Sequence, residues 1–297
     1  MNAVASQNPG ASAEAIQHHY DVSTQFYQLW LDSTCTYSCA LWQGTDDSLA
    51  AAQLRKLDFH IQQAQAQGVQ RVLDIGCGWG STLQRLVETA GIQHAVGLTL
   101  SQAQAAWIAK RQLPKVEVRL ESWTDYVPTD PFDAIISIGA FEHFAKPEFP
   151  KAQRIAGYRN FFQRCHQWLQ PGGRLSLQTI IYGNAIPGSG YTPFLGTEIF
   201  PESELPTLAD IAEASERIFE VVQLQNDRAG YKRTCQAWLS RLKANRSAAI
   251  ELVGEETVAR YEKYLNFCII AFHTGKLGLL RLTLQRINRP QASPFLS

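Results

Sequence analysis

Residues 71–80, RVLDIGCGWG, place one acid and three glycines where a ligand could be held. The apolar run before the glycines predicts a strand, and the residues from Ser81 onward predict a helix. Glycines in such a turn let backbone N–H groups approach a ligand at the N-terminus of the helix. Asp74, Gly76, Gly78 and Gly80 are therefore candidate residues for binding a nucleotide-like molecule.

The spacing of these residues does not favour a nicotinamide dinucleotide. That ligand is typically bound by G-x-G-x-x-G, with an acid about 20 residues further on that binds the ribose. Here Ser81 stands where the third glycine belongs, and the next predicted strand ends in GLTLS, with Thr99 and no acid. An NAD-dependent oxidoreductase remains an alternative, as does a turn whose glycines serve the backbone alone.

The pattern D-x-G-x-G-x-G resembles motif I of class I S-adenosylmethionine-dependent methyltransferases. Further blocks resemble those of cyclopropane-fatty-acid and mycolic-acid synthases, in the same order: HHYDVSTQFYQLWLDSTCTYSCALW, GLTLSQAQ, ESWTDY, GAFEHF, LQPGGRLSLQT, EIFPESELP and GYKRTCQAW. The resemblance covers nearly the whole chain after residue 15. It implies an enzyme that uses S-adenosylmethionine as its methyl donor.

The same resemblance implies a set of cofactor-binding residues. Asp74 would accept the cationic amino-acid end, Thr99 would take the place of the usual acid at the ribose, and Trp123 would stack on adenine. Trp123 as a core aromatic and Thr99 as a turn residue are the alternatives. The full set is Tyr37, Ser38, Asp74, Gly76, Gly78, Gly80, Thr99, Leu100, Gln104 and Trp123.

Methylation of an alkene would need more than alignment, because an alkene is a poor nucleophile and its attack leaves a carbocation. Aromatic faces stabilise such a cation, and a base then removes a proton. In the cyclopropane synthases the base is thought to be a bicarbonate held by a cysteine, a glutamate, a histidine and a tyrosine. The resemblance carries over Cys39, Glu142 and Tyr231, but Gln178 replaces the histidine and cannot carry a charge.

Each of these residues also has a structural interpretation. Cys39 and Tyr231 could be packing residues, and Glu142 could be a surface-loop acid. We expect His143 to brace its loop instead of catalysing. The aromatic residues of QFYQLW suit the core-facing side of a helix, so only Tyr20 and Tyr37 are predicted to line the reaction pocket.

The acceptor is predicted from the region that would cover it. EIFPESELP carries PES where the family carries PGG, and with Gln178 this favours an acceptor other than a membrane lipid. Our first prediction is carbon methylation of a small or medium hydrophobic acceptor, an alkene or polyketide-like metabolite. Nitrogen or oxygen methylation of a natural product comes next, then cyclopropanation of fatty-acyl chains. A cofactor-binding protein without catalysis is a distant alternative.

Composition excludes several other classes of protein. Lysine plus arginine equals aspartate plus glutamate, 27 each, which argues against a nucleic-acid partner. The six cysteines lack the spacing of a metal site, and no metal is expected. The chain shows neither a signal-peptide layout nor about 20 continuous apolar residues. We expect a soluble, cytoplasmic protein without stable membrane insertion; its oligomeric state is left open.

The elements that must position these residues alternate after Gly68. Strands are predicted at 71–77, 94–101, 116–122, 132–140, 173–181, 219–227 and 278–287, and helices at 13–31, 46–67, 81–90, 102–112, 151–169 and 231–272. This alternation predicts an α/β fold with a mostly parallel sheet, and the resemblance implies a Rossmann-like class I methyltransferase fold with seven strands. We expect disorder over 1–13, one domain over 14–297, an N-terminal helical element over 14–67 and an inserted helical cap over 182–217.

Overall fold

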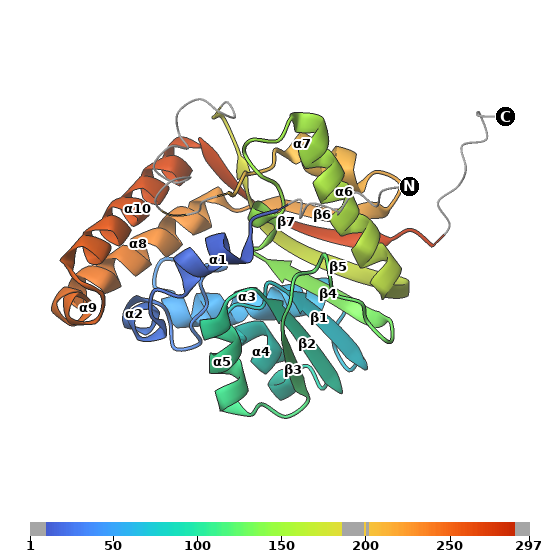
Figure 1. Ribbon diagram of the computed structural model, residues 1–297, viewed down its shortest axis with the longest axis horizontal. Coiled ribbons are helices and arrows are strands. Elements are labelled where there is room, and N and C mark those ends of the chain that lie inside the picture. Colours follow the sequence, from blue (N-terminus) through green and yellow to red (C-terminus); the bar gives the residue numbers. More distant parts are fainter. Residues whose placement is uncertain (1–9, 186–198, 200–201, 289–297) are drawn as a thin grey trace.

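The computed structural model describes residues 10–185, 199 and 202–288. Within them lies one seven-stranded sheet of order β3-β2-β1-β4-β5-β7-β6 (Figure 1). Only β7 runs antiparallel to its neighbours, so the predicted mostly parallel sheet is confirmed. The strands are β1 (Arg71–Ile75), β2 (His94–Thr99), β3 (Val116–Leu120), β4 (Phe132–Ile138), β5 (Leu169–Tyr182), β6 (Phe219–Asn226) and β7 (Leu277–Arg286).

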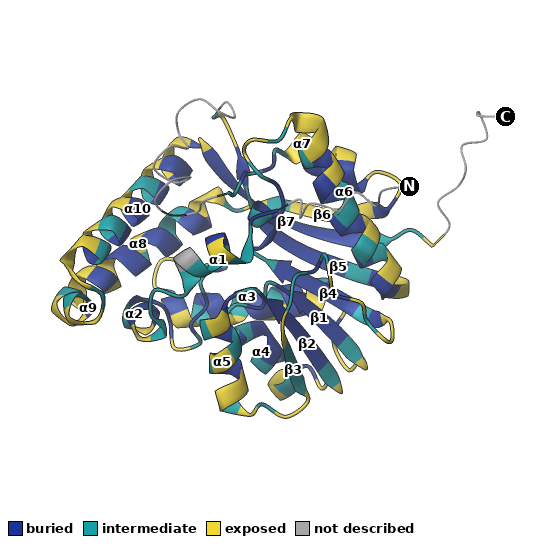
Figure 2. Cartoon of the chain, in the orientation of Figure 1, coloured by how far each residue is buried: buried dark blue, intermediate teal, exposed yellow. Residues whose placement is uncertain are grey.

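Helices cover both faces of the sheet, because successive residues of each central strand point to opposite faces. Val72 of β1 packs in one cluster with α3 (Leu49–Gln63), α4 (Ser81–Thr89) and α5 (Gln102–Arg111). Its neighbour Leu73 packs in another cluster with α6 (Lys151–Trp168) and α7 (Leu208–Ser215). The strands between the two edges of the sheet are accordingly mostly buried. The edge strands β3 and β6 and the outer sides of the helices are more exposed (Figure 2).

The first predicted helix, 13–31, is two helices. α1 (Ala13–Tyr20) ends at Asp21, and α2 (Thr24–Trp30) begins after Ser23, whose hydroxyl accepts a hydrogen bond from the N–H of Phe26. A serine in this role starts a new helix and is typical of an N-cap. The interruption lets α1 lie over α5 while α2 packs against α8 (Arg228–Ala244).

The predicted helix over 231–272 is also divided, into α8, α9 (Arg246–Val253) and α10 (Glu255–Thr274). Asn245 ends α8, and Gly254 has a positive φ of 81° that a helix interior does not tolerate. α8 and α10 lie side by side (Figure 1), and both contact β7. With α2 they form an apolar cluster rich in aromatic residues.

Parts of the predicted N-terminal segment and of the predicted cap lie outside the described residues. These parts are 1–9 in the N-terminal segment and 186–198 and 200–201 in the cap. Where the N-terminal segment is described, the N–H of Ala11 donates to the carbonyl of His143 at 2.8 Å. The N–H of Ser12 donates to Glu202 Oε2 at 2.9 Å. These two bonds connect the start of the chain to the short helix η1 (Phe141–His143) and to the described part of the cap.

Candidate functional site

The glycine turn follows β1 with a backbone that favours glycine. Gly76 has a φ of 82°, and a Cβ at that position would overlap the Cβ of Ala140. Gly78 also has a positive φ, but a Cβ there would have nothing within 4 Å. The first glycine is therefore required by close packing as well as by its backbone, and the second leaves open space beside the turn.

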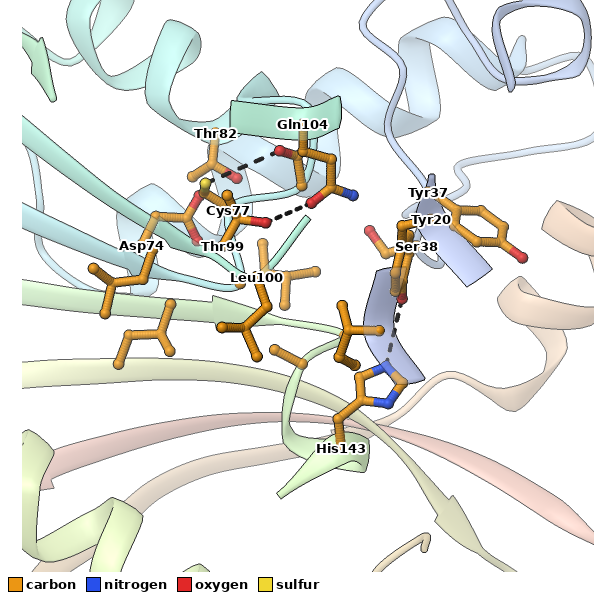
Figure 3. Close-up of a pocket in the computed structure, with 18 of the residues that line it drawn as sticks. Tyr20, Tyr37, Ser38, Asp74, Cys77, Thr82, Thr99, Leu100, Gln104 and His143 are labelled. Atoms are coloured by element: carbon orange, nitrogen blue, oxygen red, sulfur yellow. Dashed lines mark hydrogen bonds between the residues drawn. The ribbon is translucent and has the colours of Figure 1, made fainter. Parts of the chain in front are cut away.

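That space belongs to a cavity of about 130 Å³, which we call the glycine-turn cavity. It lies at the carboxyl ends of β1, β2 and β4, where parallel sheets bind ligands. Gly80 is the one predicted cofactor residue that does not line it, because this glycine packs against Ile108. The predicted residues that do line it are Tyr37, Ser38, Asp74, Gly76, Gly78, Thr99, Leu100, Gln104 and Trp123. Figure 3 shows six of them: Tyr37, Ser38, Asp74, Thr99, Leu100 and Gln104.

Asp74 supplies the main charge that the sequence predicted for this cavity. Its side chain is buried, and Oδ2 has no hydrogen-bond partner among the described residues. Burial raises the pKa of Asp74 to about 7, against the lowering effect of the Lys56 charge. A buried carboxylate in this state is stabilised by a cationic ligand.

The other polar residues of the cavity suit a nucleoside. Thr99 Oγ1 donates to Gln104 Oε1 at 2.7 Å, which fixes both side chains at the end of β2 (Figure 3). Trp123 is held by Phe144 and Phe161, with ring centroids 5.1 and 5.5 Å away. Its indole is thereby fixed at the wall of the cavity, where a flat apolar surface can stack on a base.

A second cavity of about 120 Å³ adjoins the first, and we call it the aromatic cavity. Tyr20, Tyr37, Gly139 and His143 line both cavities and so form a common wall. The aromatic side chains around this second cavity are Tyr20, Tyr37, Tyr182, Tyr231, Tyr264 and Phe272. Such a lining suits an apolar acceptor or a cationic intermediate.

Glu142 brings a carboxylate to the aromatic cavity. It lies in η1 just after β4, and its Oε1 accepts a hydrogen bond from the N–H of Ile180 at 2.6 Å. Oε2 is buried and has no hydrogen-bond partner among the described residues. Burial raises the pKa of Glu142 to about 7, so the group can exchange a proton near neutral pH.

Two further predicted residues are held at this cavity by their neighbours. Tyr231 stacks on Phe272 with ring centroids 4.4 Å apart. The Tyr20 hydroxyl lies 3.4 Å from His143 Nε2 (Figure 3). His143 Nδ1 lies 2.6 Å from the Ser203 hydroxyl. Burial lowers the pKa of His143 to about 4, so the ring is neutral and suited to the bracing role that the sequence favoured.

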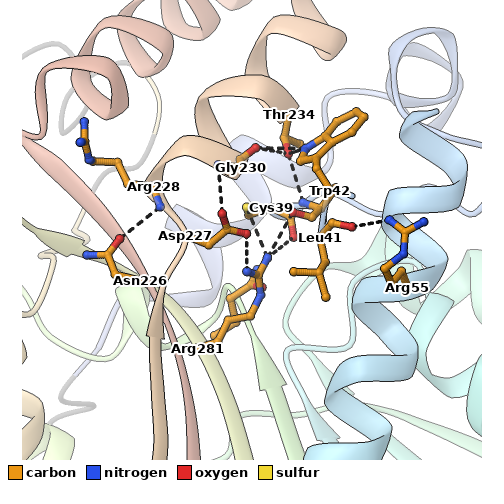
Figure 4. Close-up of polar contacts among 12 residues, drawn as sticks. Cys39, Leu41, Trp42, Arg55, Asn226, Asp227, Arg228, Gly230, Thr234 and Arg281 are labelled. Carbon is orange, nitrogen blue, oxygen red and sulfur yellow. Dashed lines mark hydrogen bonds and ion pairs between the residues drawn. The ribbon is translucent and has the colours of Figure 1, made fainter. Parts of the chain in front are cut away.

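Cys39 and Gln178 lie in a different environment. Neither lines the two cavities, and both contact the buried guanidinium of Arg281 on β7. Figure 4 shows Arg281 beside Cys39. Arg281 donates to Gln178 Oε1 at 2.8 Å, to Cys39 Sγ at 3.5 Å and to Asp227 Oδ2 at 2.5 Å. Burial raises the pKa of Cys39 to about 12, which keeps it a thiol.

The bicarbonate implied by the resemblance was to be held by four side chains. Glu142 and Tyr231 line the aromatic cavity, whereas Cys39 and Gln178 accept hydrogen bonds from Arg281 away from it. The described residues thus provide no single cavity lined by all four, and we assign no catalytic step to bicarbonate.

A polar stripe on α3 was missed in the sequence. Gln53, Lys56 and His60 are spaced at three and four residues along the buried side of this helix. Gln53 Nε2 donates to the carbonyls of Thr36 and Ser38, and Lys56 Nζ donates to Ser38 Oγ at 2.9 Å. Three polar residues at helical spacing among apolar ones were the available signal.

The fold and the glycine-turn cavity together define a class I S-adenosylmethionine-dependent methyltransferase. A family model, mycolic acid cyclopropane synthetase, matches residues 7–282, and the chain belongs to that family. S-Adenosylmethionine is its cofactor, and the unpartnered Asp74 oxygen fits the cationic end of this molecule. The predicted enzyme class, fold class and cofactor are confirmed.

Relatives of known identity agree with this assignment. Cyclopropane mycolic acid synthase 3 of Mycobacterium tuberculosis (strain CDC 1551 / Oshkosh) is 35% identical over 288 residues, 91% of this chain and 96% of the relative. The solved structure of the cyclopropane synthase MmaA2 from Mycobacterium tuberculosis has a TM-score of 0.85 and 34% identity, covering 94% of this chain and all of that one. The synthase CmaA1, complexed with SAH and CTAB, has the same TM-score and identity.

More distant structures show the fold alone. Coclaurine N-methyltransferase is 19% identical, with a TM-score of 0.77 over 95% of this chain.

In the part of the chain that the structure describes, no helix is long and apolar enough to cross a bilayer. The same residues contain no group of three or more histidine, cysteine or acidic side chains that could hold a metal ion.

Proposed function

We propose that this methyltransferase acts on a carbon–carbon double bond of a long apolar acceptor and closes a cyclopropane ring. One observation carries the proposal: the Glu142 carboxylate, which has an oxygen without a hydrogen-bond partner among the described residues, lines the aromatic cavity. This cavity shares a wall with the glycine-turn cavity. The named relatives are cyclopropane synthases, and CmaA1 has been solved with CTAB, a surfactant with one long alkyl chain. These findings support cyclopropanation over carbon methylation without ring closure and over nitrogen or oxygen methylation, the two reactions that the sequence ranked ahead of it.

When bound, the cofactor would supply an electrophilic methyl group, and S-adenosylhomocysteine would be its leaving group. The tyrosines of the common wall, Tyr20 and Tyr37, exclude water and face the cation that forms when the alkene carbon bonds the methyl. Glu142 accepts a proton from the transferred methyl group. The electron pair of that C–H bond then joins the methyl carbon to the cationic carbon, which closes the ring.

Methylation without ring closure is the second candidate, and Glu204 favours it. This residue is a second acid on the aromatic cavity, and burial raises its pKa. If the proton leaves from a neighbouring carbon of the chain instead of from the methyl group, the product is a methyl-branched alkene. The two candidates differ in the carbon that loses the proton.

Cofactor with a fully deuterated methyl group distinguishes the two products. We would incubate the enzyme with unsaturated phospholipid vesicles and, separately, with free unsaturated fatty acids and alkene-containing metabolites. A cyclopropane retains two deuterons of the methyl group, whereas a methyl-branched alkene retains three, and mass spectrometry separates them. Transfer to amines or phenols but to no alkene would refute both candidates.

A further inference from the structure

Lys56 is a buried cation that the mechanism above does not use. It projects from α3, is 1% exposed, and lines the glycine-turn cavity together with Asp74. Its Nζ donates to Ser38 Oγ at 2.9 Å. An ammonium has three N–H groups to donate, and the described residues provide no acid within 4 Å of this one.

The charges around Lys56 do not compensate for its burial. Asp32 and Asp74 favour the charged form of the lysine, as does Cys39, while Arg281 opposes it. Burial is the largest effect and lowers the pKa of Lys56 to about 7. An anion entering the cavity would restore the charged ammonium, because it would supply the missing counter-charge.

The Asp32 carboxylate is not available as that partner. It accepts hydrogen bonds from the N–H of Thr34 at 2.9 Å and of Thr36 at 3.0 Å, and also from the Thr34 hydroxyl. These bonds hold Asp32 to its own loop. The cavity therefore combines one unpartnered carboxylate oxygen, on Asp74, with one ammonium that has donors to spare.

The amino-acid end of the cofactor carries the complementary pair of charges, an ammonium and a carboxylate. We propose that the Lys56 ammonium, held in place by Ser38, binds the α-carboxylate of the cofactor while Asp74 takes the α-ammonium. The inference rests on the cofactor assignment and not on the acceptor, so it can be tested without an acceptor.

A pair of ligands tests the inference directly. S-Adenosylhomocysteine carries the carboxylate, whereas 5′-methylthioadenosine lacks the whole amino-acid end. For Lys56→Met we expect the affinity for S-adenosylhomocysteine to fall about 10- to 100-fold, as for a lost charged hydrogen bond. The affinity for 5′-methylthioadenosine should stay within about two-fold. Lys110→Met, the same change at an exposed lysine of α5, is the matched control.

Proton uptake gives a second readout. At pH 8 most of the free enzyme holds Lys56 neutral, since its pKa is about 7, and Asp74 already ionised. Binding of S-adenosylhomocysteine should then take up close to one proton, measured by calorimetry in buffers of different ionisation enthalpy. Lys56→Met should take up none.

The possible outcomes distinguish an error in the role of Lys56 from an error in the cofactor assignment. Equal weakening of both ligands by Lys56→Met, or proton uptake that survives the substitution, would show that Lys56 only supports Ser38. If S-adenosylhomocysteine failed to bind the unaltered enzyme, the cofactor assignment itself would be overturned.

Discussion

The proposed chemistry depends on two buried carboxylates that lie in similar surroundings. Asp74 and Glu142 each have one oxygen without a hydrogen-bond partner among the described residues, and burial raises the pKa of each to about 7. Their positions give them different partners. Asp74 lines the glycine-turn cavity, which we propose holds the cationic end of the cofactor, whereas Glu142 lines the aromatic cavity, which we propose holds a hydrocarbon acceptor.

Replacing Glu142 should separate catalysis from binding. Glu142→Gln keeps the hydrogen bond that the side chain accepts from Ile180 but cannot accept a proton. We expect turnover to be lost, with the affinity for S-adenosylhomocysteine unchanged within about three-fold. Calorimetry and a product assay check the two quantities. An equal loss of both would make Glu142 a structural or cofactor-binding residue.

The Glu142 carboxyl group also predicts how the activity depends on pH. A base works only when deprotonated, and the raised pKa of Glu142 places this change near pH 7. We therefore expect kcat/KM to rise with pH through about 7 and to level off above it. Cofactor-binding titrations at each pH show whether Lys56 and Asp74 contribute to the profile. A profile that is flat between pH 5 and 8 would argue against Glu142 as the base.

At the scale of elements, the glycine turn is where packing and cofactor binding are combined. Gly76 must pass close to Ala140, so the loop after β4 is set directly against the loop after β1. That contact places η1, with Glu142, beside the glycine-turn cavity. Substitutions at the turn should therefore change stability in a way that differs between its glycines.

Gly76→Ala and Gly78→Ala form a matched pair. Both put alanine at a positive φ, which costs about 1–3 kcal/mol. Only Gly76→Ala also forces an overlap with Ala140, for which overpacking adds about 1–3 kcal/mol. Denaturant unfolding should show the larger loss of unfolding free energy for Gly76→Ala. Equal losses would mean that the Ala140 loop moves aside at little cost.

Much of the element order could be predicted from the sequence, because apolar strands and capped helices are local signals. The predicted strands all occur, and their ends lie within a few residues of those observed. The two helices that proved to be divided had local signals as well, Ser23 and Gly254. What the sequence could not show is that Arg281 lies beside Cys39 and Gln178, since this contact joins segments that are far apart along the chain.

At the scale of the whole molecule, Arg281 connects three parts of the fold. From β7 it donates to the segment of Cys39 and Ala40 and to Gln178 of the neighbouring strand β5. It also donates to Asp227 at the start of α8 (Figure 4). Its side chain is fully buried, and that of Asp227 is 19% exposed. This ion pair therefore holds α8, with Tyr231, against the sheet.

Arg281→Met should destabilise the fold strongly. Removing one partner of a buried ion pair costs about 3–5 kcal/mol, and we expect the lower end because Asp227 keeps some contact with water. Arg85→Met, which breaks the exposed pair with Asp58, should cost less than about 1 kcal/mol. Denaturant unfolding compares the two variants. Similar losses would mean that the buried pair contributes no more than a surface one.

The place of β7 in the sheet has a consequence for how the protein is made. Among the described residues β7 comes last of the seven strands, yet it lies between β5 and β6, with a paired strand on each side. Until β7 has been synthesised, the edges of β5 and β6 that pair with it have unpaired backbone N–H and C=O groups. Such edges can pair with strands of other molecules. The aromatic cavity is lined by Leu277 of β7 as well as by Tyr264 and Phe272 of α10. We infer that the nascent chain completes this cavity only after β7 has been synthesised.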